Sequence, residues 1–183
     1  MNYQFLPVEW QTERLVVHDG TLTEVAELRE VFNTCHHVEK WDPTFTLVPM
    51  EEMTEVVAQS VNAPLDDEKQ FRLQTARVQG DERIIGYFHT YQRYLYPDLA
   101  FISMMVIRAD EQGMGYGQEL MAGLWQQFGA LGWCQRVWLH VYLKNWPALR
   151  FWVGQGFTKV IEVKGDKVHA EEAQALVTLE KVL

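Results

Sequence analysis

A glycine-rich turn constrains the fold of this 183-residue chain more than any other segment. Residues 112–117 read QGMGYG, follow the apolar run 99–107 and lead into an amphipathic helical pattern. Glycines at alternate positions leave backbone N–H groups bare at the start of a helix, where the helix dipole favours an anion. The turn therefore predicts a phosphate site between a strand and a helix.

Two other phosphate-binding loops fit this turn poorly. No Gly-Lys-Ser/Thr sequence ends it, which argues against a P-loop. Leu120 stands where a dinucleotide-binding fold needs its third glycine, and no acidic residue follows at about 20 residues to hold a ribose. A nucleotide-binding domain that uses the turn in another way remains an alternative.

Composition indicates one globular domain spanning residues 1–183. Hydrophobic residues make up 48% of the chain and aromatic residues 13%, and a chain of this length buries about 70% of its unfolded surface. Neither a membrane-span pattern nor a signal peptide is visible. Cys35 and Cys134 lack metal-ligand spacing, so we expect buried thiols, no metal and a cytoplasmic location.

Charge is unevenly distributed along the chain. The net charge of −9 argues against a nucleic-acid partner and weakly favours a cationic substrate. Residues 120–161 contain no Asp or Glu but include Arg136, Lys144, Arg150 and Lys159. This segment follows the glycine turn and suits a polyanionic cofactor, although a core segment can avoid carboxylates for packing reasons alone.

A second motif follows the strand pattern at 136–143. It consists of Asn145, Ala148 and the pair Gly156-Phe157. Together with the glycine turn it resembles the two signature motifs of the GNAT N-acetyltransferase family, and residues 12–15 resemble the first strand of the ribosomal-protein acetyltransferase branch. The resemblance covers about residues 10 to 180. It implies an α/β fold with a mixed, mostly antiparallel twisted sheet of about seven strands, flanked by about four helices.

Local patterns place the elements of this fold. Strands are predicted at 13–18, 71–78, 83–91, 99–107, 136–143, 157–163 and 175–183. Helices are predicted after the capping box Thr21–Glu24, after Pro49, after the glycine turn and after Asn145. Residues 35–47 read as irregular and residues 62–69 as a solvated loop.

The resemblance implies that acetyl-CoA is the cosubstrate. Backbone groups of the turn would hold its pyrophosphate, and the end of the 99–107 strand would pair with its pantetheine arm. Asn145 would hydrogen-bond that arm, although it can equally serve as a helix cap alone or do both. The implied donor-binding residues are Met105, Val106, Ile107, Gln112, Gly113, Met114, Gly115, Tyr116, Gly117, Asn145, Ala148 and Trp152.

Two positions carry the expected proton transfers. His140 stands where similar ribosomal-protein enzymes have a glutamate proposed as general base, so it is the candidate base, although a structural role on the strand is equally open. Trp152 replaces the tyrosine that often protonates the leaving thiolate in the family. Indole is a poor acid, so Tyr142, Tyr116 or water would act instead.

The acceptor side is the least determined. His37, Trp41, Tyr87 and Phe101 are expected to line the acceptor cleft, with packing in the core as the alternative for each ring. Other polar residues of the irregular segment are His36, Glu39 and Asp42. The resemblance implies acetyl transfer to a primary amine of a small molecule or of a peptide or protein N-terminus, by a monomer or homodimer. The alternative is a non-catalytic acyl-CoA-binding module on the same fold.

Overall fold

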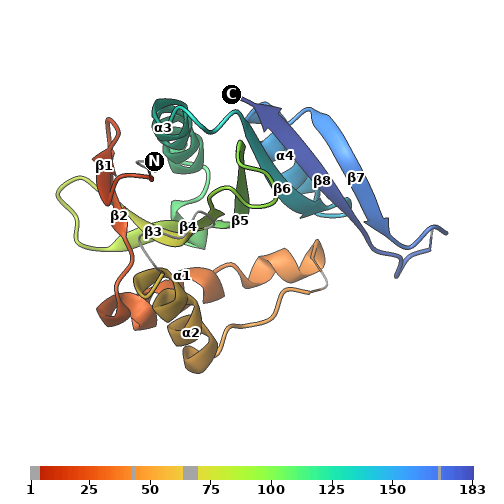
Figure 1. Cartoon of the computed structure of the whole chain (residues 1–183). Helices are drawn as coiled ribbons and strands as arrows, with labels where there is room; N and C mark the ends of the chain where they lie inside the picture. The colour runs from red at the N-terminus through yellow and green to blue at the C-terminus, as the bar shows by residue number, and fades with distance from the viewer. Residues whose placement is uncertain (1–4, 43, 64–69, 169) are drawn as a thin grey trace.

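The computed structural model describes residues 5–42, 44–63, 70–168 and 170–183. Within these residues, eight strands form one sheet in the order β1-β2-β3-β4-β5-β6-β8-β7 (Figure 1). All neighbouring strands are antiparallel except β5 and β6, which are parallel. The strands are β1 Glu9–Gln11, β2 Leu15–Asp19, β3 Phe71–Val78, β4 Ile84–Tyr91, β5 Leu99–Ile107, β6 Arg136–Tyr142, β7 Lys159–Gly165 and β8 Ala175–Val182.

Helices and short 3-10 turns connect the strands. The α-helices are α1 Val25–Asn33, α2 Met50–Val61, α3 Tyr116–Ala130 and α4 Trp146–Gly154, and the 3-10 turns are η1 Leu22–Glu24, η2 His36–Lys40 and η3 Ala109–Glu111. The predicted fold class and the order of the main elements are therefore confirmed.

Three details differ from the sequence-based prediction. The short strand β1 (Glu9–Gln11) pairs with β2 and brings the sheet to eight strands rather than seven. The segment 35–47, predicted to be irregular, contains the 3-10 turn η2. Pro43 and most of the loop predicted at 62–69 lie outside the described residues.

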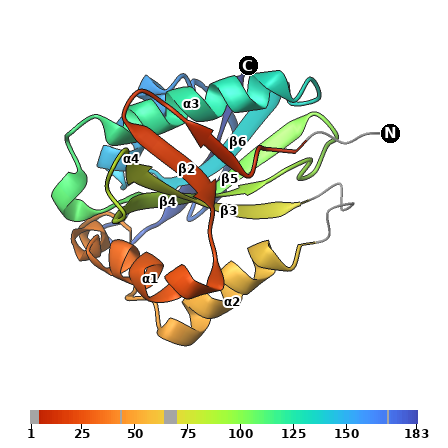
Figure 2. The same cartoon turned by 90° about the vertical axis from the view of Figure 1, so that its left-hand side faces the viewer.

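The two faces of the sheet are covered unequally. Helices α1 and α2 lie on one face of the β2–β5 half, and α3 lies on the other face (Figures 1 and 2). β4 is therefore buried at every position from Ile84 to Thr90. In β6, by contrast, Val137, Leu139 and Val141 are buried and the residues between them are not. The β6-β8-β7 half thus packs one face against the core and leaves the other open.

The capping residues and apolar patterns in the sequence predict where the helices form. The Thr21–Glu24 capping box closes as predicted, and the apolar stripe of α1 behind it is buried. Leu120, Leu124 and Phe128 of α3 are fully buried against the sheet. None of the helices in the described part of the chain combines the length and apolar character needed to cross a bilayer.

Candidate functional site

β5 and β6 run together for only part of their lengths. Their backbone pairing extends from Leu99 opposite Arg136 to Ile102 opposite Leu139 and then stops. Beyond that point β5 continues to Ile107 paired with β4, and β6 continues paired with β8. The facing edges of the two strands therefore present N–H and C=O groups that neither strand satisfies for the other. An extended ligand can add to such an edge.

A β-bulge lies at the point where the strands diverge. His89 of β4 pairs with Met104 and Thr90 pairs with Ile102, so Ser103 is an extra residue in β5. Bulges bend the strand that carries them and increase its twist. The opening between β5 and β6 is thus a product of strand register, not of a flexible loop.

The glycine turn lies at the end of β5 that borders this opening. Gly113 and Gly115 have φ angles of 81° and 84°, in the region where a side chain is strained, and Gly115 is the N-cap of α3. A Cβ added to Gly117 would stand 3.4 Å from Met105 Cε and 3.5 Å from Phe151 Cε2. The first N–H groups of α3 lack intrahelical acceptors, so the turn offers aligned donors to an anion.

The β1–β2 connection fastens the start of α3. Both Glu119 oxygens accept hydrogen bonds, Oε1 from the Arg14 N–H at 2.7 Å and Oε2 from Arg14 Nε at 2.6 Å. The same guanidinium donates to the Met114 carbonyl at 3.2 Å and lies 4.6 Å above the Tyr116 ring. Burial alone would raise the pKa of Glu119, but hydrogen bonds from Thr12 and Arg14 hold it below its usual value. The carboxylate therefore stays charged and anchors the turn.

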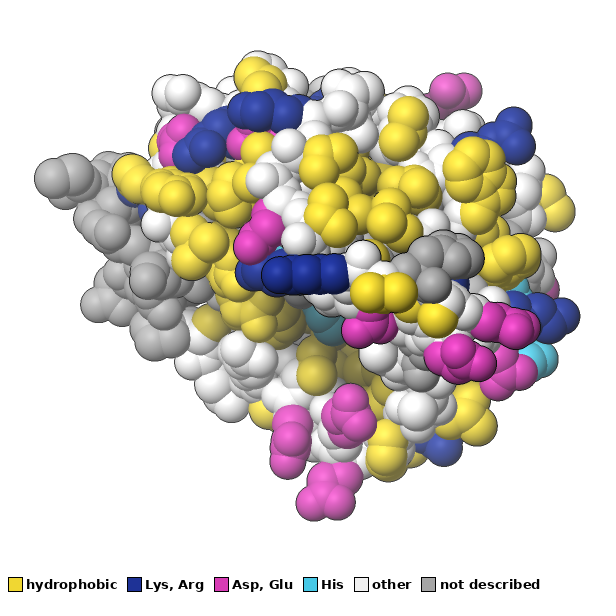
Figure 3. Space-filling model, turned by 90° about the vertical axis from the view of Figure 1, so that its right-hand side faces the viewer, with side chains coloured by type: hydrophobic (Ala, Val, Ile, Leu, Met, Phe, Trp, Pro, Cys, Tyr) yellow, Lys and Arg dark blue, Asp and Glu magenta, His cyan; other side chains and the backbone are white. Residues whose placement is uncertain are grey.

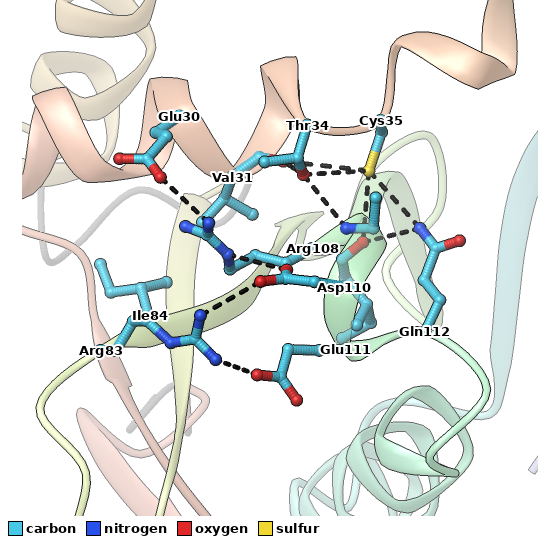
Figure 4. A network of polar contacts seen from close by, with 12 residues as sticks. Glu30, Val31, Thr34, Cys35, Arg83, Ile84, Arg108, Asp110, Glu111 and Gln112 are labelled. Atoms are coloured by element: carbon cyan, nitrogen blue, oxygen red, sulfur yellow. Dashed lines mark hydrogen bonds and ion pairs between the residues drawn. The ribbon is translucent and has the colours of Figure 1, made fainter.

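A polar network ties the other end of the turn to the C-terminal end of α1 (Figure 4). The Ile107 carbonyl accepts hydrogen bonds from Gln112 Nε2 at 2.8 Å and from Cys35 Sγ at 3.2 Å. Gln112 Nε2 also lies 3.5 Å from the sulfur. Burial raises the pKa of the Cys35 thiol, so the group remains a protonated donor. The sequence predicts a buried thiol at this position but gives no sign of its contact with the turn.

The same network continues along η3. Arg108 donates to Glu30 at 3.0 Å and to Asp110 at 3.1 Å, and the Ala109 N–H donates to Thr34 Oγ1 at 3.1 Å (Figure 4). Several of these contacts join residues more than 70 positions apart, so no local sequence signal could reveal them. They hold the end of β5, the turn and α1 in one fixed arrangement.

His140 lies on the open face of β6, as strand alternation predicts. Its Nδ1 lies 3.0 Å from Thr178 Oγ1, and its ring meets Phe101 edge-on with centroids 4.8 Å apart. Desolvation lowers the pKa of His140, the charge of Lys164 lowers it further, and Glu162 opposes both. When Nδ1 carries the proton and donates to Thr178, Nε2 keeps a lone pair that can accept a proton.

The motif residues on α4 have clear structural roles. Asn145 Oδ1 accepts the Ala148 N–H at 3.2 Å and caps the helix. Trp152 is 9% exposed and packs edge-on against Phe157, with centroids 5.5 Å apart. The indole is therefore part of the core at the base of α4. Tyr142, two residues after His140, is half-buried on β6.

The predicted acceptor residues do not all lie together. Phe101 is 6% exposed beside His140, while His37 in η2 is half-buried and Trp41 just after it is 40% exposed. Tyr87 requires a correction. Its ring is 1% exposed in the core cluster beneath α1 and α2, because β4 is buried on both faces, so it packs the core and is closed to an acceptor.

On the side of the molecule where the β7–β8 hairpin lies, hydrophobic side chains gather in several groups among charged and other side chains (Figure 3). Among the residues that the structure describes, no group of three or more His, Cys, Asp or Glu side chains is arranged to hold a metal ion. The groups that border the opening are the backbone of the turn, the edge of β5 and the side chains around His140.

Comparison with known proteins agrees with this geometry. A sequence profile of the acetyltransferase (GNAT) family matches residues 25–157. A search of curated protein sequences found no match.

Solved structures with the same fold include several acetyltransferases. An acetyltransferase from Thermus thermophilus is 20% identical, with a TM-score of 0.69 over 95% of this chain and 100% of that chain. A ribosomal-protein-S5-alanine acetyltransferase from Vibrio fischeri is 15% identical, with a TM-score of 0.71 over 96% and 97%. A microcin C7 self-immunity acetyltransferase in complex with acetyl-CoA and AMP is 16% identical, with a TM-score of 0.70 over 93% of both chains.

Proposed function

Because the chain belongs to the acetyltransferase (GNAT) family, we propose that it transfers the acetyl group of acetyl-CoA to a primary amine. One observation carries this proposal. β5 diverges from β6 beside a glycine turn that caps a helix, which leaves a strand edge and an anion site next to each other. Acetyl-CoA combines an amide-bearing pantetheine arm with a pyrophosphate, so it fits both at once.

The donor would be held mainly by backbone groups. The N–H groups of residues 112–117 would bind the pyrophosphate, and the free edge of β5 at 105–107 would pair with the pantetheine amides. A β5 N–H directed at the thioester oxygen would stabilise the oxyanion. Asn145 Oδ1 is occupied by the helix cap, which leaves its amide NH2 for the donor. The microcin C7 self-immunity acetyltransferase, which has the same fold, is a complex with acetyl-CoA, and this supports acetyl-CoA as the donor.

His140 would act as the general base. It takes one proton from the acceptor ammonium, and the amine nitrogen then forms a bond to the acetyl carbon. The nitrogen of the tetrahedral intermediate loses its second proton to solvent, and the intermediate collapses with cleavage of the carbon–sulfur bond, releasing the neutral N-acetyl product and the coenzyme A thiolate. The lowered pKa of His140 keeps the imidazole neutral and ready at neutral pH.

The leaving thiolate would take its proton from water or from Tyr142. Trp152 is buried in the core and its indole is not an acid at neutral pH. A coenzyme A thiolate is a tolerable leaving group, so turnover does not require a dedicated acid. The buried Trp152 is also the feature that favours the second candidate function, a non-catalytic acyl-CoA-binding module.

Further parts of the proposal rest on sequence alone. We propose a monomer or homodimer in the cytoplasm, with neither nucleic acid nor membrane as partner, in line with the net charge of −9. We also propose a place near the ribosomal-protein acetyltransferases, which the first-strand residues Thr12–Leu15 and the Vibrio fischeri neighbour support.

One assay tests the proposal and separates it from the binding module. Thiol release from acetyl-CoA is measured with a panel of primary amines, alongside the melting temperature with and without acetyl-CoA. Amine-dependent thiol release supports the enzyme. A raised melting temperature without thiol release for any amine indicates the binding module. No shift at millimolar acetyl-CoA contradicts both.

A further inference from the structure

We propose that the acceptor is a small monoamine whose amino group is carried on an aromatic body, which packs against Tyr91 and Tyr94 beside His140. This inference rests on the proposed function and adds the class of acceptor. It follows from the arrangement of rings and charges on the open face of the sheet.

Cross-strand pairing places four aromatic side chains in one row, which runs from the buried Phe71 of β3 onto the open face of β6. Phe71 pairs with Tyr91, Tyr91 with Phe101, and Phe101 with Trp138. Directly opposite residues of neighbouring strands point to the same face, so the four rings form a continuous strip. The strip crosses from β4 to β6 where the two halves of the sheet still pair. His140 lies two residues beyond Trp138, at the start of the opening.

The β4–β5 connection adds a further ring to this strip. Tyr94 lies flat on Phe101, with centroids 4.7 Å apart and planes inclined by 19°, and its ring centre is 5.7 Å from that of Tyr91. The neighbouring Arg93 has a φ angle of 51°, a conformation that non-glycine residues adopt at a cost in energy. The chain thus accepts local strain where it folds Tyr94 onto Phe101. Tyr91 and Tyr94 remain partly exposed, and Phe101 connects them to His140.

The charges on the same face are already paired. Among the described residues, Glu180 and Glu162 on this face and Asp98 at its edge contact cations at 2.8, 2.9 and 2.8 Å, in the pairs Glu180–Lys159, Glu162–Lys164 and Asp98–Arg136. Opposite this face, Asp42 accepts hydrogen bonds from Thr44, and Glu39 is exposed. One ammonium group is attracted by the net charge of the protein. A second ammonium finds no unpaired carboxylate on this sheet face within the described ranges.

These two observations select the acceptor chemistry. We place the amino group of the acceptor at His140 Nε2. A short linker then lets an aromatic ring of the same molecule lie over the surface formed by Phe101, Tyr94 and Tyr91. Ring contacts then discriminate in favour of an aromatic body over a saturated one. A polyamine forgoes the ring contacts and leaves its further charges unpaired against an apolar surface. The amine still attacks the acetyl carbon and releases the coenzyme A thiolate, so no additional reactant is needed.

The test compares kcat/KM for four amines at saturating acetyl-CoA. They are phenethylamine, cyclohexylethylamine, butylamine and spermidine, with a short peptide that begins with Phe as a fifth arm. We expect the kcat/KM of phenethylamine to exceed that of butylamine by about tenfold or more. It should exceed that of cyclohexylethylamine by about two- to tenfold. Tyr94→Leu keeps an apolar side chain but removes the ring face, so it should abolish the preference for phenethylamine over cyclohexylethylamine.

A matched control lies on the same loop. Tyr96 is 48% exposed and contacts Trp138 and Arg136 instead of Phe101, so Tyr96→Leu should leave the preference unchanged. Acetyl-CoA should still raise the melting temperature of both variants. Equal kcat/KM for phenethylamine and butylamine, or a higher value for spermidine, overturns the inference while the acetyltransferase proposal stands. A faster reaction of the Phe peptide overturns the commitment to a small molecule. If none of the amines supports thiol release, both proposals are overturned.

Discussion

The two sides of the opening between β5 and β6 are built from different interactions. On the donor side, Arg14 and Cys35 reach the turn and the end of β5 from distant parts of the chain, and Gln112 holds the Ile107 carbonyl from within the turn. Apart from the guanidinium of Arg14 over the Tyr116 ring, these contacts are hydrogen bonds and an ion pair. On the acceptor side, Tyr94, Phe101 and His140 meet mainly through ring faces and edges. Directional bonds thus fix the backbone of the proposed pyrophosphate site, whereas ring packing forms the surface proposed to select the acceptor.

The comparison also explains why side chains should contribute less to donor binding than to acceptor recognition. When a ligand is bound by backbone N–H groups, the side chains serve mainly to hold that backbone in position. An acceptor that is read by side chains depends on each of them directly. Substitutions on the donor side should therefore change acetyl-CoA affinity, and those on the acceptor side should change turnover or selectivity.

The largest effect is expected at His140. His140→Ala removes the proposed base and should lower kcat by a factor of about 10² to 10⁴. Acetyl-CoA affinity, measured by thermal-shift titration, should change little. Because the pKa of His140 is lowered, the wild-type rate should rise with pH and reach its plateau at a lower pH than an ordinary histidine would give. Unchanged turnover would move the role of base to the 36–42 segment or to water.

Substitutions of Trp152 measure how much the core beneath α4 contributes to stability and to turnover. Trp152→Ala should reduce the free energy of unfolding by roughly 3–5 kcal/mol, because it empties a buried site beside Phe151 and Phe157. Chemical denaturation measures the change. Trp152→Tyr keeps most of the volume and restores a hydroxyl, so it should fold and keep or raise turnover. A well-folded tyrosine variant with markedly slower turnover would show that the indole shapes the active site itself.

Gly115 tests the fixed backbone of the donor side. Gly115→Val places a branched side chain at a φ angle of 84° and should weaken acetyl-CoA binding by about 1–3 kcal/mol, or roughly five- to 150-fold. Gly129→Ala is the control on the same helix, since an added Cβ there meets no atom within 4 Å. Isothermal titration with acetyl-CoA measures both. A Gly115→Val protein that is folded and binds normally would refute the anion site.

Gln112 tests the network that holds the turn. Gln112→Ala removes one hydrogen bond to the Ile107 carbonyl and should raise the KM for acetyl-CoA up to about tenfold, with kcat unchanged. Gln126→Ala on the exposed face of α3 is the control. A change in kcat alone would contradict a role confined to the donor. This split between KM and kcat distinguishes positioning from a general loss of stability.

The sequence predicted those features that depend on neighbouring residues. The glycine turn, the capping box at Thr21 and the cap at Asn145 are local, so their residue types were sufficient. The three-residue strand β1 was missed because Glu9–Gln11 is too short to show alternation. Tyr87 was misplaced because only the tertiary structure reveals that both faces of β4 are covered.

The sequence predicts which segments form the candidate site, but it predicts few of the contacts within that site. His140 was placed correctly by alternation along its strand, but its partner Thr178 lies on β8, 38 positions away. The links from Cys35 to Ile107 and from Arg14 to Glu119 span 72 and 105 positions. Such pairs depend on how the sheet is assembled, and a single sequence contains no periodic signal for them.

The short parallel ladder between β5 and β6 has a mechanical consequence. Four residue pairs, from Leu99–Arg136 to Ile102–Leu139, form the ladder that joins the two halves of the sheet, and Asp98 extends it by accepting backbone hydrogen bonds from Gln135 and Arg136. Few inter-strand hydrogen bonds need to break for the halves to separate, so we expect local opening and amide hydrogen exchange to begin at this ladder. A ligand lying between β5 and β6 would touch both halves and act as a clamp. With the proposed donor bound there, we expect proteolysis to slow, because a ligand that binds the closed form stabilises it.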